Sequence, residues 1–405
     1  KMSLGIEMPA SVLKPTPDSF ALVRTLLDEV TPNFSSRRVN INCDETFELG
    51  KGASAAAVAE DGKSRVYLSF VRKIIDHLQG QGKEVLFWGD VLRSHPELLD
   101  ELPAQDLIAL VWHYEAPGAD KKVPEWALSV LAEFGMNEES LQGFAYHVRS
   151  FAAAKVPFWV CPGTSSWNSL VGRLPNARAN LDDAALVGAA SGASGYLITD
   201  WGDNGHMQPF VVSMMPLIEG AGLSWWRDSH LGQDLSALMD QLGLATPVDG
   251  LGRILERLGA LGECAGPTGI NGSPLHERLV GGGLPSDGVV DPDGVRFILA
   301  ELEEVREELR DLFLPLKVGE SLRAELMAAI RLARQGAWIL AQEAGLDTPS
   351  PEALAADLIE AIECQRVAWL SVSRPGGLVD SIRRLEATLR IHRGEAPEVN
   401  PEASF

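Results

Sequence analysis

The sequence predicts an α/β protein followed by an all-helical part, and two patterns in its 405 residues support this class. In the first half, short apolar runs alternate with amphipathic segments, which is typical of parallel strands joined by helices. From about residue 232 onward, apolar residues recur at three- and four-residue spacing between proline and glycine breaks. We therefore expect a βα domain over residues 1–231 and a helical domain over residues 232–405.

Five strands are predicted in the first half, each apolar almost throughout and so expected to be covered on both faces. Helical patterns near 64–82, 138–154 and 176–191 fall between them. The predicted strands are 37–45, 84–91, 106–115, 157–163 and 195–203. Five strands are too few for a closed eight-stranded barrel, so either the sheet is open or further strands lie outside this sequence.

Charge and cysteine content exclude several classes of partner. A formal net charge of −21 would repel nucleic acid and anionic membranes, so neither is expected as a partner. No run of eighteen or more apolar residues is present, so no membrane span is expected. The four cysteines are scattered without a CxxC pair, which indicates reduced thiols in a cytoplasmic protein and no structural zinc.

Polar and aromatic residues collect where the predicted strands end. Asp44 and Glu45 follow the first strand, and Trp167 lies in the loop after the fourth. The others at strand ends are Trp88, Asp90, Trp112, Tyr114, Trp201 and Asp203. Because the carboxyl ends of parallel strands carry the active sites of α/β proteins, we expect these side chains to share one site.

The paired acids and the tryptophans indicate what such a site would do. At a turn, Asp44 and Glu45 can flank one ligand, one as proton donor and one as orienting anion. The alternative is that one acid caps a helix or pairs with Arg37 or Arg38. Several converging tryptophans would form an aromatic-walled pocket suited to the apolar faces of a sugar.

Other tryptophans are predicted to pack in the core. Trp159 lies in the middle of a predicted strand. The remaining ones in this group are Trp225, Trp226, Trp338 and Trp369.

A competing interpretation is a magnesium site. Asp44, Asp90 and Asp203 would supply oxygen ligands, and His206 would serve as the base. This alternative needs no aromatic walls, and no lysine stands at a strand end to act as the base instead.

Four of these motifs resemble, in order, those of the glycoside hydrolase family 20 β-N-acetylhexosaminidases. They are "NINCDETFELGKG" (40–52), "VLFWGDVL" (85–92), "ALVWHYE" (109–115) and "GYLITDWGDNGH" (195–206). The first of them is most similar to the hexosaminidase D-like branch, and the resemblance covers residues 15–225. It implies a (β/α)8 barrel of the TIM type, with strands four to eight in this chain. We expect that strands one to three, and an arginine that grips sugar hydroxyls, come from an N-terminal portion or another segment.

The resemblance also implies roles for individual residues. Glu45 would protonate the leaving oxygen and then activate water. Asp44 would hold the acetamido N–H, and Tyr114 the acetamido oxygen, which is the nucleophile in this family. The implied substrate-binding residues are Trp88, Asp90, Trp112, Trp167, Trp201 and Asp203.

The expected function is therefore a retaining exo-β-N-acetylhexosaminidase that acts on terminal GlcNAc or GalNAc, with neither a cofactor nor a metal. The alternative is a non-catalytic glycan-binding or scaffold protein on a degenerate barrel. The helical domain would serve packing or dimerisation, and a homodimer is an arrangement that the sequence leaves open.

Overall fold

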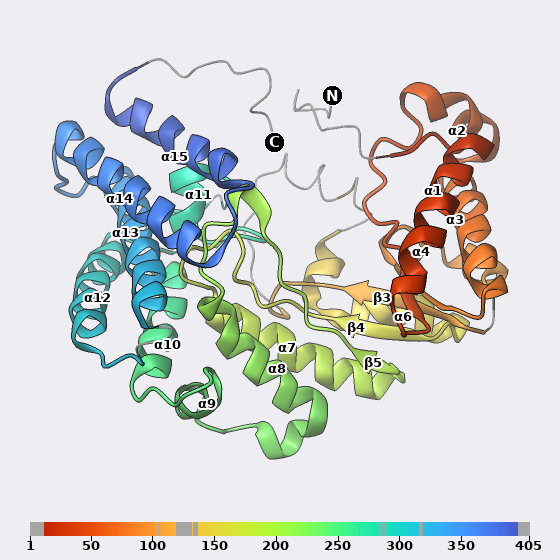
Figure 1. Ribbon diagram of the computed structural model, residues 1–405, viewed down its shortest axis with the longest axis horizontal. Helices are drawn as coiled ribbons and strands as arrows, with labels where there is room; N and C mark the ends of the chain where they lie inside the picture. The colour runs from red at the N-terminus through yellow and green to blue at the C-terminus, as the bar shows by residue number, and fades with distance from the viewer. Residues whose placement is uncertain are drawn as a thin grey trace.

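The computed structural model describes residues 12–103, 105–118, 132, 137–266, 268–282, 286, 288–315 and 319–395. Within these residues the protein is an α/β structure with a parallel sheet in the middle and helices around it (Figure 1). Helices from the first part of the chain cover the sheet at one end, and a separate group of later helices lies at the other end.

The sheet has five strands in the order β1-β2-β3-β4-β5, and every neighbouring pair is parallel. The strands are β1 (Arg38–Asn40), β2 (Glu84–Trp88), β3 (Leu107–Trp112), β4 (Phe158–Cys161) and β5 (Gly195–Tyr196). The prediction of a parallel βα region is confirmed, although each strand is shorter than its apolar run. The acidic residues at the ends of these runs lie outside the strands, in turns or at the start of short helices.

Alternation along the strands gives the sheet two apolar faces. Val85 and Phe87 of β2 pack into the cluster shared with the helices, while Leu86 and Trp88 belong to a smaller cluster on the opposite face. The surrounding helices are α1 (Pro17–Val30), α2 (Ala55–Asp61), α3 (Lys63–Gly80), α4 (Asp90–Arg93), α6 (Phe144–Ala154), α7 (Leu174–Ser191) and α8 (Val211–His230). Trp88 therefore lies on the face of the sheet opposite to the one that packs against the helices.

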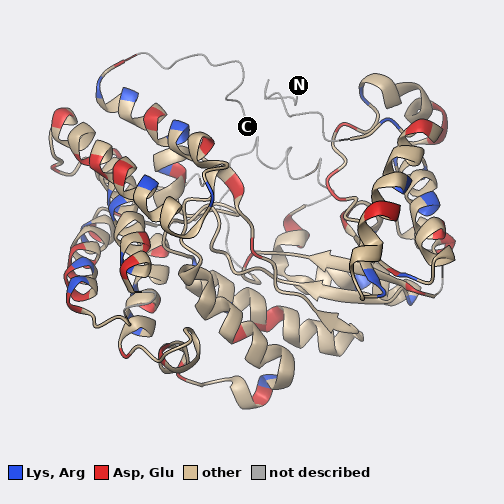
Figure 2. Ribbon diagram, in the orientation of Figure 1, with Lys and Arg blue, Asp and Glu red and all other residues tan. Residues whose placement is uncertain are grey.

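Beyond residue 232 the described chain is helical, as predicted. It forms α9 (Leu235–Leu242), α10 (Leu251–Cys264), α11 (Pro274–Val280), α12 (Pro292–Asp311), α13 (Gly319–Glu343), α14 (Pro351–Val372) and α15 (Leu378–His392). α11 and α13 approach so closely that a Cβ at Gly336 would meet the carbonyl oxygen of Leu275 at 2.1 Å. Charged residues of both signs lie along the outer helices of this group (Figure 2).

The two parts of the chain share a hydrophobic core. One buried cluster runs from Leu170 and Val212, beside and within the βα part, to Leu258 of α10 and Leu389 of α15. Trp338 and Trp369 pack against this cluster, as predicted. The division at residue 231 remains a prediction.

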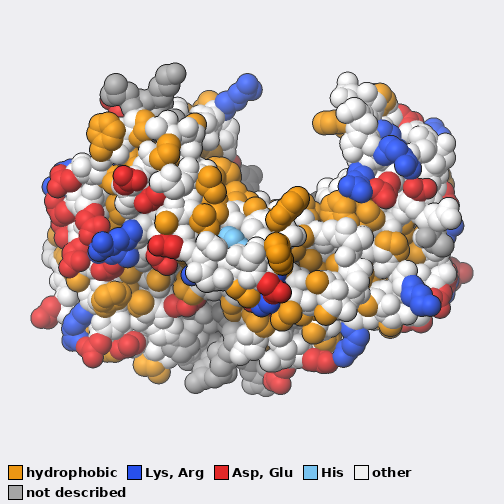
Figure 3. Space-filling model, turned by 90° about the horizontal axis from the view of Figure 1, so that it is seen from below, with side chains coloured by type: hydrophobic (Ala, Val, Ile, Leu, Met, Phe, Trp, Pro, Cys, Tyr) orange, Lys and Arg blue, Asp and Glu red, His pale blue; other side chains and the backbone are white. Residues whose placement is uncertain are grey.

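Some apolar side chains of the first helix lie at the surface. Leu22 and Leu26 of α1 are more than half exposed. Seen from below, the surface has a notch between the end formed by α1–α3 and the helical end, with hydrophobic side chains along its floor (Figure 3). In the part of the chain that the structure describes, no helix has both the length and the apolar character needed to cross a membrane.

Candidate active site

The adjacent acids Asp44 and Glu45 lie on a turn that follows β1. The strand ends at Asn40, and the backbone of Asn42, Cys43 and Glu45 is left-handed, with φ of 56°, 69° and 49°. In a continuing strand these two side chains would point to opposite faces. The turn removes that alternation, so both carboxylates can flank one ligand.

The alternative that an acid of this pair binds Arg37 or Arg38 is wrong. Arg37 forms an ion pair with Asp106 at 3.0 Å, and Arg38 forms one with Glu84 at 2.6 Å. Both arginines are thus used at the opposite, N-terminal end of the neighbouring strands. Ion pairs with Arg37 or Arg38 therefore do not explain why Asp44 and Glu45 stand next to each other.

The electrostatic environment favours a proton on Glu45. Burial, together with the charges of Asp44, Asp90 and Asp203, raises the pKa of its carboxyl to about 7. The side chain nevertheless remains accessible to solvent, so it can exchange its proton. Burial also raises the pKa of Asp44. A carboxyl that holds its proton near neutral pH is what general acid catalysis requires.

Five predicted aromatic residues form one connected cluster beside these acids. The ring of Tyr114 stacks on Trp112 at 5.3 Å between centroids and meets the edge of Trp167 at 5.1 Å. Trp201 donates a hydrogen bond from Nε1 to the Tyr114 hydroxyl at 3.2 Å, and its ring lies 6.2 Å from Trp88. Side chains from the ends of β2, β3, β4 and β5 are thereby brought together.

The members of this cluster differ in what they offer to a ligand. Trp201 is 37% exposed, whereas Trp167 is 2% exposed and donates from Nε1 to the Asn271 side chain at 2.7 Å. A side chain as covered as Trp167 supports Tyr114 and presents little surface of its own. The binding role predicted for Trp167 stays a prediction.

Tyr114 is also linked to the acids. The charge of Glu45 and, above all, burial raise the pKa of the Tyr114 hydroxyl, so it stays protonated as a hydrogen-bond donor. Asp203 begins a short 3-10 turn after β5, η5 (Asp203–Gly205), and burial raises the pKa of its carboxyl. Asp44, Glu45, Tyr114 and Asp203 therefore belong to one neighbourhood.

Two asparagines on α7 hold the turn that carries Tyr114, and sequence reasoning missed both. Asn176 donates to the Tyr114 carbonyl at 2.7 Å and accepts from the Ala116 amide at 2.9 Å. Asn180 donates to the His113 carbonyl at 3.0 Å. Both are buried, and their four-residue spacing on the inner side of a helix was the available signal.

A buried ion pair supports the same turn. Glu115 and Arg173 are 3% and 4% exposed and form two hydrogen bonds, at 2.8 and 3.2 Å. The backbone amide of Asn271, from the loop before α11, donates to Glu115 at 2.7 Å. The helical part of the chain thus contributes directly to the support of the candidate site.

Asp90 contacts the turn that carries Glu45, and its predicted role in sugar binding stays a prediction. Its Oδ2 accepts a hydrogen bond from the Glu45 backbone amide at 3.0 Å. Its Oδ1 is buried and has no hydrogen-bond partner among the described residues. Burial raises the pKa of Asp90 to about 6.

The magnesium alternative finds no support in the described residues, where no three His, Cys, Asp or Glu side chains form a group able to hold a metal ion. His206, its proposed base, instead places its ring against Trp369 of α14 at 6.3 Å.

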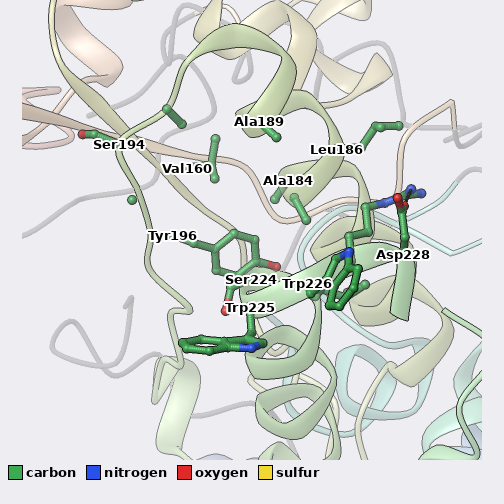
Figure 4. A pocket seen from close by; sticks show the side chains of 16 residues that line it. Val160, Ala184, Leu186, Ala189, Ser194, Tyr196, Ser224, Trp225, Trp226 and Asp228 are labelled. Carbon is green, nitrogen blue, oxygen red and sulfur yellow. Dashed lines mark ion pairs between the residues drawn. The ribbon is translucent and has the colours of Figure 1, made fainter. Parts of the chain in front are cut away.

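One cavity adjoins the site, and a second lies apart from it. A cavity of about 180 Å³ adjoins Glu45 and Asp90 and is also lined by Lys63 and His95. A second cavity, of about 560 Å³, lies between α7, α8 and β5 and contains none of the predicted site residues (Figure 4).

The prediction that two tryptophans near this second pocket pack in the core is wrong. Trp225 and Trp226 were predicted to pack in the core, but they are 90% and 65% exposed at the rim of the pocket. The backbone of Trp226 leaves the helical region, with φ of −159° and ψ of 92°. α8 is therefore bent at Trp226.

Comparisons with known proteins add little. No protein-family model matches the chain, and no curated protein matches it. Among solved structures, a chitobiase from Flavobacterium johnsoniae (FjGH20) is similar with a TM-score of 0.32 and 11% sequence identity. The match covers 92% of this chain and 59% of the chitobiase chain. A likeness of this size carries no argument about function.

Proposed function

We propose that the protein is a retaining exo-β-N-acetylhexosaminidase that uses the 2-acetamido group of its substrate as the nucleophile. The observation that carries this proposal is the meeting of Glu45, whose pKa is about 7, with Asp44 on the same turn and with the aromatic cluster around Tyr114. Sugar binding alone does not require an acid that keeps its proton at neutral pH.

Each residue has a distinct duty in the proposed reaction. Glu45 gives its proton to the glycosidic oxygen while the acetamido oxygen attacks C1 and the C1–O bond breaks. Asp44 accepts the acetamido N–H and stabilises the positive charge of the oxazolinium ring, and Tyr114 donates to the acetamido oxygen. Glu45, now a carboxylate, then takes a proton from the water that attacks C1, which reopens the ring and restores the β configuration.

The aromatic cluster would hold the sugar. Trp112 and Trp201 would supply apolar ring faces for its C–H groups, with Trp201 the more open to a ligand, and Trp88, which is 5% exposed, would support Trp201 from the side. Asp203 would accept hydrogen bonds from sugar hydroxyls. The substrate class is a small or oligomeric sugar with a terminal β-linked N-acetylhexosamine.

The finer fold that we propose is a (β/α)8 barrel in which β1–β5 are strands four to eight. Among the described strands, β1 and β5 each pair with a single neighbour. Exposed apolar side chains stand near these two edges, on α1 and at Trp225 and Trp226 of α8. Closure by further βα units would cover such edges and remove their unpaired backbone groups.

The test is release of p-nitrophenol from p-nitrophenyl β-N-acetylglucosaminide. We expect turnover of this substrate, little turnover of the β-glucoside that lacks the acetamido group, and a first product in the β configuration by proton NMR. Inversion, or equal turnover of both glycosides, would contradict the acetamido mechanism. Sugar binding without turnover would favour the glycan-binding alternative, for which the open sheet is the supporting observation.

Variants of the paired acids separate their duties. Glu45→Gln should lose far more activity on a disaccharide than on the aryl glycoside, because a poor leaving group needs the proton more. Asp44→Asn should lower kcat on both substrates by about 100- to 1000-fold, since it removes one preorganised contact to the charged ring. Binding of a thiazoline mimic of the intermediate to Glu45→Gln controls for an intact pocket.

A further inference from the structure

The turn that carries Glu45 is strained. Three of its four residues from Asn42 to Glu45 have positive φ, and none of them is glycine. Residues with a Cβ occupy this conformation only where the surrounding structure holds them there. Something outside the turn must therefore maintain the direction in which Glu45 points.

Contacts from two other elements hold this turn. Tyr67 of α3, which is 3% exposed, donates its hydroxyl hydrogen to the Cys43 carbonyl at 2.8 Å. Asp90, the first residue of α4, accepts the Glu45 amide at 3.0 Å. These two hydrogen bonds hold the carbonyl that precedes Asp44 and the amide that follows it.

A third contact holds the start of the turn. Trp88 donates two hydrogen bonds to Asn42, from its backbone amide to the carbonyl at 3.0 Å and from Nε1 to the side-chain oxygen at 3.2 Å. The turn is thus fixed to β2 at its beginning and to α3 and α4 further on. Asp90 differs from the other partners because it also carries charge.

We propose that Asp90 and Tyr67 are positioning residues for Glu45, holding the left-handed turn that aims its carboxyl at the leaving group, and that Asp90 acts on Glu45 instead of binding the sugar. This inference rests on the proposed function for what Glu45 does, but the geometry on which it depends exists without substrate. The Oδ2 of Asp90 accepts the protein's own backbone amide and its Oδ1 is buried, so the carboxylate is directed at the turn.

The charge of Asp90 can be tested through the pKa of Glu45, which would not change if Asp90 had a purely structural role. Its carboxylate is one of the charges that raise the pKa of Glu45. The groups that face Glu45 from the surrounding elements are Asp44, Asp90, Asp203 and Tyr114, together with Lys63 and His95 of the adjoining cavity. Asp90 accepts a hydrogen bond from the Glu45 amide, and its charge also raises the pKa of the Glu45 carboxyl.

Three variants separate the hydrogen bond from the charge. Asp90→Asn keeps an oxygen that accepts the Glu45 amide but removes the charge. Asp90→Ala removes both, and Tyr67→Phe removes a hydrogen bond to the turn without changing any charge. Asp183→Asn is the matched control, because Asp183 also accepts a backbone amide, from Phe144 at 2.7 Å, but does so at the start of α6.

The first measurement needs no catalysis. The Glu45 carboxyl is titrated by 13C NMR and assigned by its disappearance in Glu45→Gln. In Asp90→Asn the midpoint should fall by about one pH unit, because a like charge has been removed. In Tyr67→Phe and Asp183→Asn it should stay unchanged. An unchanged midpoint in Asp90→Asn would overturn the role of Asp90.

The second measurement is kinetic, on the aryl N-acetylglucosaminide. Asp90→Ala should lower kcat by about 100-fold through misplacement of Glu45, with KM changed less than about threefold. Tyr67→Phe should also lower kcat through misplacement of Glu45, and Asp183→Asn should have the kcat of the wild type. A raised KM with unchanged kcat in Asp90→Ala would show that Asp90 binds substrate. If the wild type itself releases no p-nitrophenol, the proposed function fails while the NMR midpoints still decide the positioning inference.

Discussion

At the scale of single residues, the main feature of the site is the effect of the surroundings on the pKa of Glu45. Glu45 lies where burial and three other carboxylates all oppose its ionisation, which raises its pKa to about 7. Burial raises the pKa of its neighbour Asp44 as well, and in the proposed reaction Asp44 would have to be ionised to stabilise a positive charge. Two adjacent acids with different surroundings can therefore perform different duties, as general acid and as anion.

These surroundings predict how activity depends on pH. We expect kcat/KM to fall about tenfold per pH unit above about pH 7, because only protonated Glu45 can donate and its protonated fraction falls above its pKa. At low pH kcat/KM should fall again as Asp44 becomes protonated. Initial rates at low substrate concentration, measured from about pH 4 to about pH 9, test this. A rate that stays constant through pH 7 to 9 would show that Glu45 is not the proton donor.

At the scale of elements, the turn after β3 is built by side chains of other elements. Asn176 and Asn180 bind its carbonyls from α7, and Arg173 pairs with Glu115 beneath it. The Arg173 guanidinium and the Glu115 carboxylate are both almost inaccessible to solvent. Removing Arg173 would take away the cation that pairs with the buried Glu115 carboxylate.

Arg173→Met should therefore destabilise the protein strongly. We expect the free energy of unfolding to fall by about 3–5 kcal/mol, since Glu115 would keep a buried charge. The control is Arg296→Met, whose partner Asp293 is 91% exposed, and there the change should stay within about 1 kcal/mol. Urea unfolding followed by circular dichroism measures both. Equal effects of the two substitutions would contradict a structural role for the buried pair.

At the scale of the whole molecule, one core joins the βα part to the later helices. Buried residues of α8, α10, α13 and α15 belong to the same hydrophobic cluster. Asn271 extends this connection to the candidate site through its hydrogen bonds to Trp167 and Glu115. The helical part therefore stabilises the region that holds Tyr114.

A shared core predicts cooperative unfolding. Tryptophan fluorescence, which reports largely on the first 231 residues, and helical circular dichroism should give the same urea midpoint. Leu258→Ala, at a fully buried position of α10, should lower both midpoints together, with a loss of about 2–5 kcal/mol. Two separate midpoints would instead show that residues 1–231 and 232–405 unfold as independent domains.

Local patterns in the sequence determined the parallel βα order, the helices beyond residue 232 and the grouping of acids and aromatic residues after the strands. Hydrophobic periodicity depends only on neighbours along the chain, so these features could be read without the fold. The same patterns misjudged Trp225 and Trp226, because apolar spacing on a helix is identical whether or not another element covers that face.

Only the tertiary structure decided how the site is held. Asp90 meets the Glu45 amide across 45 residues, and Asn271 meets Glu115 across 156 residues. The left-handed turn from Asn42 to Glu45 has no glycine to reveal it, since strain of this kind is maintained by distant partners such as Tyr67. Contacts of this length depend on how strands and helices pack in space, and no local period in the sequence encodes them.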